Sequence, residues 1–181
     1  MKCRSGFSRD FLPRACTMNP KTYDLSSTYV RLRGDASVEP LAVDDTFWER
    51  ISKGELGSFH NEYLVTSHSF DSDWSVWEMH PNGDEIVYLI SGAVTFILKI
   101  EGEPRGLELK EGGQYVIVPK GVWHTARTGK SSRMLFITAG EGTRHRDVTP
   151  GGTVSRESDW RRPRAEHRAG CPRACTPRNH R

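Results

Sequence analysis

Four side chains that could bind a metal ion or move a proton stand beside apolar runs near the middle of the sequence. Glu78, His80 and Glu85 fall within "WEMHPNGDEIVYLISG", which spans 77–92, and His124 ends the stretch "GGQYVIVPKGVWH". Burying carboxylates or imidazoles costs free energy unless a partner compensates them. These side chains therefore either face water or together hold a cation.

The chain between these residues can bring them to one place. Glu78 and His80 are two residues apart, so on a strand both side chains point to the same face. The turn "PNGD" would return Glu85 alongside that strand in a hairpin, and a second strand and turn lead to His124. Two imidazoles and two carboxylates could thus converge from two hairpins.

The same strand phase puts Trp74 and Val76 on the face of Glu78, where we expect them to line a substrate pocket. Donor chemistry favours a metal ion among these groups, because two histidines and one carboxylate suit non-haem Fe(II). With Glu78 added the set favours Mn, Fe or Ni over Cu, and we expect a divalent ion, one of Fe, Mn, Ni or Zn. Taken singly, each residue has an ordinary alternative as a strand-end histidine, a core-edge histidine or a solvated turn carboxylate.

The elements around the site predict an all-β domain with one short helix. Residues 44–53 begin with two aspartates, place apolar side chains on one helical face and end before Gly54. Short strands separated by turn residues are typical of an antiparallel barrel or sandwich. The strands are expected at 29–33 (as an edge strand), 59–67, 73–80, 85–91, 93–100, 106–110, 115–118, 122–128 and 132–139. Both faces of 85–91 are apolar, which predicts a covered outer face and a homodimer.

Charge divides the 181 residues into a central domain and two tails. Ten arginines against four acidic residues make 144–181 basic, and 1–27 is polar; we expect both tails to be disordered and the folded domain to span 28–143. All four cysteines lie in the tails, which fits a reducing cytoplasmic setting without a disulfide framework. The sequence shows no apolar run that would span a membrane and no helix-turn-helix, which argues against membrane and nucleic-acid partners.

The four candidate ligands fall within two motifs of defined residue spacing. Residues 78–92 read Glu-x-His-x4-Glu-x6-Gly, and 113–124 read Gly-x5-Pro-x-Gly-x2-His. This pair resembles the two signature motifs of the cupin superfamily over roughly 60–140. In that family the first motif normally begins His-x-His, whereas Glu78 stands first here, and Thr128 stands where the second motif usually ends in Asn.

The resemblance implies a double-stranded β-helix, the jelly-roll cupin barrel, with one internal metal site. Carried over by position, the ligands are His80, Glu85 and His124, with Glu78 fourth. Glu78 then either ligates the ion, serves as a catalytic acid or base beside it, or marks a site that has lost its metal. The implied function is a metal-dependent enzyme of the dioxygenase, isomerase or decarboxylase class acting on a small molecule; the alternative is a non-catalytic sensor that binds a small ligand.

Overall fold

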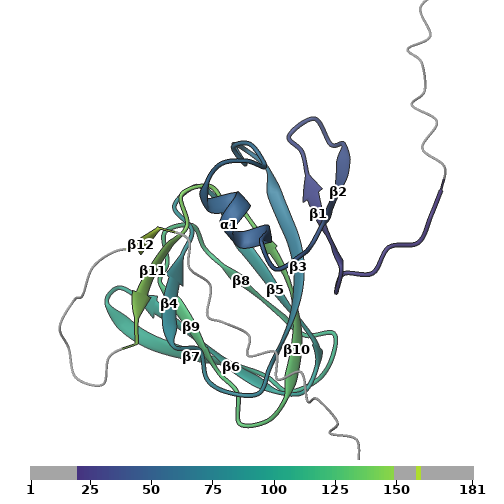
Figure 1. The fold of residues 1–181 in the computed structure, drawn as a ribbon. Coiled ribbons are helices and arrows are strands. Elements are labelled where there is room, and N and C mark those ends of the chain that lie inside the picture. The colour runs from purple at the N-terminus through teal and green to yellow at the C-terminus, as the bar shows by residue number, and fades with distance from the viewer. Residues whose placement is uncertain (1–19, 149–157, 160–181) are drawn as a thin grey trace, which may run out of the picture.

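The computed structural model describes residues 20–148 and 158–159, which form two antiparallel β-sheets with one short helix (Figure 1). Each sheet has six strands. The first runs in the order β2-β1-β3-β10-β5-β8, and the second in the order β12-β11-β4-β9-β6-β7. The predicted all-β architecture with one short helix is confirmed. The expected disorder of the tails concerns mainly residues outside the described ranges.

Strands of the two sheets alternate along much of the chain. The first sheet contains β1 (Thr28–Leu32), β2 (Val38–Ala42), β3 (Tyr63–Phe70), β5 (Glu85–Ser91), β8 (Tyr115–Val118) and β10 (Ser132–Thr138). The second contains β4 (Val76–Met79), β6 (Val94–Ile100), β7 (Glu103–Leu109), β9 (His124–Arg127), β11 (Arg144–Asp147) and β12 (Ser158–Asp159). The helix, α1 (Phe47–Ser52), lies between β2 and β3 in the sequence.

The main core fills the space between the two sheets. Val87 and Leu89 from β5 and Phe136 from β10 meet Phe96 from β6, and each of the four is at most 1% exposed. These residues follow the period-2 alternation of their strands, so one face of each sheet turns inward. Burial of such side chains contributes roughly 1.5–3 kcal/mol each, which makes this interior the main source of stability.

A second cluster forms where α1 packs beside β1 and β3. Asp44 accepts a 2.9 Å hydrogen bond from the backbone N–H of Thr46 in the turn before the helix; Thr46 is the N-cap residue, and Gly54 follows the helix with a φ of 71°. Phe47 and Ile51 form its buried face. The helix predicted over 44–53 is therefore present, with a shorter regular part.

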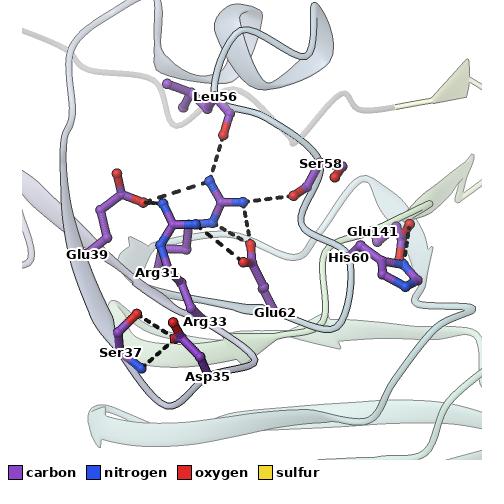
Figure 2. A network of polar contacts seen from close by, with 10 residues as sticks. All are labelled: Arg31, Arg33, Asp35, Ser37, Glu39, Leu56, Ser58, His60, Glu62 and Glu141. Carbon is purple, nitrogen blue, oxygen red and sulfur yellow. Dashed lines mark hydrogen bonds and ion pairs between the residues drawn. The ribbon is translucent and has the colours of Figure 1, made fainter. Parts of the chain in front are cut away.

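Arg31 ties this second cluster together (Figure 2). Its guanidinium pairs with Glu62 and donates to the backbone carbonyls of Leu56 at 2.7 Å and Ser58 at 2.8 Å. It also lies 4.3 Å from the centre of the Phe59 ring. A buried guanidinium needs such partners to offset its desolvation. Arg31 thus fixes the loop between α1 and β3 against β1.

Several predicted boundaries are wrong. β1 is not an edge strand, because β2 pairs along its outer side from Thr28 opposite Ala42 to Leu32 opposite Val38. The strand expected at 59–67 begins only at Tyr63. The boundary at 143 is also wrong: β11 pairs with β4 beyond it, so the second sheet continues to Asp147.

The outer face of β5 and β8 carries exposed apolar side chains. Tyr88 lies opposite Tyr115 across these strands, and they are 38% and 59% exposed. Ile90 and Ile117 on the same strands are 39% and 52% exposed. The described part of the chain therefore leaves this face open to solvent, although a cover was expected. Among the described residues, no helix is long and apolar enough to cross a membrane.

Candidate metal centre

Three neighbouring strands of the second sheet set a row of ionisable side chains into the interior. His145 on β11 is opposite Glu78 on β4, and Glu78 is in turn opposite His124 on β9. Directly paired residues of antiparallel strands share a face. His80 follows Glu78 by two residues and lies on the same side, as the strand period predicts. The second sheet therefore contributes one carboxylate and three imidazoles.

Glu85 reaches the same point from the first sheet, where it begins β5. Its Oε1 lies 3.4 Å from His80 Nε2, and its Oε2 lies 3.1 Å from His124 Nε2. Thr138, opposite Glu85 on β10, donates a 2.5 Å hydrogen bond to Oε1. The carboxylate is thus held from its own sheet and faces the two imidazoles of the other.

The ligand atoms of Glu78, His80 and His124 all lie within 4.8 Å of one another. Each of these residues is at most 4% exposed, and Glu85 is 1% exposed. Glu85 is outside that triad but touches both of its imidazoles. The structure therefore brings the four predicted residues together in a buried cluster.

The outward nitrogens of both imidazoles are engaged, which fixes their orientation. The hydroxyl of Thr143 donates to the carbonyl of Gly140 at 2.9 Å, so at its 2.8 Å contact with His80 Nδ1 the hydroxyl accepts and the nitrogen donates. His124 Nδ1 lies 3.3 Å from the carbonyl of Val122 and also donates. In the neutral imidazoles both Nε2 atoms then carry a lone pair toward the cluster, the tautomer that metal binding requires.

Glu85 is ionised in this environment. Burial raises the pKa of its carboxyl, but the charge of His80 and the close contacts of His124 and His80 outweigh burial and hold the pKa well below its ordinary value. Without a bound ion, the Glu85 carboxylate is stabilised by imidazole protons, and a metal ion that binds at the Nε2 atoms would displace those protons. Such a site attracts a cation.

The donor set fits a divalent metal ion. His124 Nε2 and Glu85 Oε2 have no hydrogen-bond partner among residues 20–148, although both atoms are buried. A bound cation would compensate the desolvation of both. Imidazole nitrogens with carboxylate oxygens suit Fe, Mn, Ni and Zn. Glu78, His80, Glu85 and His124 are the residues that would hold it.

The two residues expected to line a substrate pocket differ in their surroundings. Trp74 is buried in the core, its ring 6.2 Å from that of His124 and 5.5 Å from that of Phe96. Val76 is half-buried, and its carbonyl accepts a 2.8 Å hydrogen bond from the hydroxyl of Thr125. Trp74 thus fills space next to His124, and a pocket lined by both residues stays a prediction.

Two surface cavities lie away from the cluster. One of about 340 Å³ is lined by residues of β6, β7 and the turn at 127–130, and another of about 470 Å³ by the ends of β7 and β8. Neither is lined by any of the four clustered residues. The metal-binding groups therefore lie in the closed interior, apart from these two hollows.

Sequence reasoning missed two residues of the site. His145 was assigned to the edge of the arginine-rich tail, yet it is 2% exposed with its Nε2 3.4 Å from Glu78 Oε1. Thr143, which orients His80, lies in the turn before β11. The alternation in "TRHRD" was the one available signal, because it places Thr143 and His145 on the same face.

Comparison with known proteins gives structural matches only. No protein-family model matches the sequence, and no curated protein is significantly similar to it. Among solved structures, a cupin-2 domain containing protein from Shewanella frigidimarina matches over 42% of this chain and 69% of its own, with 20% identity and a TM-score of 0.37. The described residues form a sandwich of two antiparallel sheets, the kind of architecture that the resemblance to cupins implies.

Two further neighbours are enzymes. Hydroquinone 1,2-dioxygenase from Sphingomonas sp. TTNP3 matches at 18% identity and a TM-score of 0.34, over 42% of this chain and 59% of that one. An oxalate oxidase matches at 13% identity and a TM-score of 0.39, over 45% and 44%. The strand order itself confirms the expected all-β architecture of two packed sheets. Likenesses this distant bring no activity with them.

Proposed function

We propose that this chain is a metal-dependent enzyme that acts on a small molecule and holds its ion in the interior of the cupin-like sandwich. The observation behind the proposal is the buried cluster in which the Nε2 atoms of His80 and His124 meet the carboxylate of Glu85. Glu78 closes the cluster from β4. Fe, Mn, Ni or Zn fits these donors, and the reaction classes considered are dioxygenation, isomerisation and decarboxylation.

A bound divalent ion would supply Lewis acidity to a substrate carboxylate, enolate or hydroxyl group. The chain's own residues orient the ligands, transfer a proton and exclude water. Thr143 and the Val122 carbonyl hold the two imidazoles in the tautomer that binds metal. Glu78 would hold the ion, and it is the residue that we assign to proton transfer in states where its carboxylate is not bound to the ion. The aromatic side chains around His124 exclude water from the inner side of the site.

The test begins with the metal content of the purified full-length chain, measured by elemental mass spectrometry without chelator in the buffers. The double variant His80→Ala, His124→Ala removes two imidazoles, and His60→Ala, an exposed histidine paired with Glu141, is the matched control. We expect about one equivalent of metal in the wild type and in the control, and less than a tenth in the double variant. Equal metal in all three would contradict the proposal.

One observation favours a second candidate, a non-catalytic protein that binds a small ligand. The clustered residues are at most 4% exposed, and Trp74 and Phe96 pack against His124, so the site is more enclosed than substrate exchange requires. Turnover separates the candidates. An enzyme loaded with Fe(II) should consume small hydroxy or carboxylic acids in a mass-spectrometric screen, whereas a binding protein should show saturable binding of a ligand that remains unchanged.

A further inference from the structure

His145 is a buried histidine that neither sequence motif includes. It lies on β11, directly opposite Glu78 on β4. Its neighbour Arg146 points to the opposite face, where its guanidinium lies 3.7 Å from the centre of the Trp123 ring. The alternation of this short strand therefore sends one imidazole into the interior and leaves the arginines outside.

The contacts of His145 are incomplete within the described part of the chain. Its Nε2 lies 3.4 Å from Oε1 of Glu78, and neither ring nitrogen has a hydrogen-bond partner among residues 20–148. A typical N–H···O separation is shorter by about 0.5 Å, so a small movement of either side chain completes the bond. An imidazole at 2% exposure gains from such a bond, because water cannot replace it.

We propose that His145 is a positioning residue of the metal centre, which donates from Nε2 to the Glu78 carboxylate and holds it toward His80 and His124. The inference rests on the proposed metal site. Ligating carboxylates are commonly fixed by such outer partners. His145 contacts the Glu78 carboxylate, whereas Glu85, which is also outside the triad, contacts both of its imidazoles; this difference assigns His145 to Glu78 and not to the ion.

Two amide substitutions distinguish the nitrogens of the ring. Glutamine at 145 places an N–H near the position of Nε2, whereas asparagine places one near Nδ1. The full-length chain and its variants His145→Gln, His145→Asn and His145→Leu are loaded with Co²⁺, and both affinity and visible absorption are measured. His60→Gln, at a histidine whose side chain is 70% exposed, is the matched control.

We expect the Asn and Leu variants to bind Co²⁺ about 10–100-fold more weakly than the wild type, and the Gln variant to stay within about threefold. The absorption bands of the loaded Gln variant should match those of the wild type, because the ligands are unchanged. Weak binding by the Gln variant, or altered bands in it, would overturn the positioning role.

The two proposals fail in different ways. If the wild type does not bind Co²⁺, the metal site itself is refuted. If the wild type and the Leu variant bind equally, only the role of His145 is refuted. Circular dichroism establishes which variants fold. If His145→Leu does not fold, the Co²⁺ affinities of His145→Gln and His145→Asn still test the role of His145.

Discussion

The hydroxyl of Thr143 offers the sharpest test of how the chain prepares its imidazoles. Thr143 is fully buried, accepts from His80 Nδ1 at 2.8 Å and donates to the carbonyl of Gly140 at 2.9 Å. Thr143→Val conserves the shape of the side chain and removes both interactions. A buried donor or acceptor left unsatisfied costs about 1–3 kcal/mol, so we expect the free energy of unfolding to fall by about 3 kcal/mol.

Metal binding should weaken as well, because His80 loses the partner that holds its tautomer. Loss of such an outer contact lowers metal affinity about 10–100-fold, which corresponds to about 1.4–2.8 kcal/mol. The assays are urea unfolding in the presence of a chelator and Zn²⁺ affinity by competition with a fluorescent chelator. Thr143→Ser, which keeps the hydroxyl, should retain metal affinity.

Thr66→Val is the matched control. Thr66 is also fully buried, on β3, but its hydroxyl has no hydrogen-bond partner among the described residues. Replacing an unpartnered hydroxyl with a methyl group should leave stability unchanged or raise it, and should not affect metal binding. The reasoning is refuted if the two valine variants behave alike, or if Thr143→Val binds Zn²⁺ as tightly as the wild type.

Three more predictions concern the wider molecule. Arg31→Met should lower the free energy of unfolding by about 2–3 kcal/mol, because the carbonyls of Leu56 and Ser58 lose their donor and Glu62 keeps only Arg33, at 3.6 Å, as a cation; a loss below about 1 kcal/mol in urea would contradict this. We expect the wild type to be a homodimer through the exposed apolar face of β5 and β8, measured by light scattering at micromolar concentration. Ile117→Glu on that face should give a monomer, whereas Val38→Glu, at an equally exposed position on β2, should remain a dimer. A monomeric wild type would refute this prediction. In metal-free protein, ionised Glu85 stabilises the fold above about pH 4.5, and this stabilisation is lost as the pH falls through the lowered pKa of Glu85. Glu85→Gln should therefore make the urea midpoint depend less on pH in the acid range. The same pH dependence in wild type and variant would contradict this prediction.

The convergence of the four clustered residues was predictable because it rests on local rules. The period of a strand places Glu78 and His80 on one face, and a tight turn returns the chain to Glu85. The helix at Phe47–Ser52 was predictable for the same reason, since its preceding aspartates, apolar face and terminal glycine all lie within residues 44–54. Each of these signals depends only on neighbours in the sequence.

The parts that were missed depend on distant pairing. β11 is four residues long and mostly charged, and it is a strand because it pairs with β4, nearly seventy residues earlier in the chain. β2 contains Glu39 and Pro40, which lower strand propensity but are tolerated at the edge of a sheet. The strand expected at 59–67 starts late because Asn61, with a φ of 54°, belongs to a turn. Tertiary contacts override local preference in the first two cases, whereas local turn geometry decides the third.

The single register pair between Glu78 and His124 has a consequence for motion. β4 and β9 share only that pair, and the other hydrogen bonds between these segments are isolated, such as those from Thr125 to Val76 and from Trp74 to Ala126. The second sheet is thus weakly joined between β4 and β9, at the site itself. We call this junction the seam; Glu78 and His80 lie on its β4 side, and His124 lies on its β9 side. Amide exchange should therefore be fastest along this seam in metal-free protein, and slower when a bound ion links Glu78 and His80 to His124 across it.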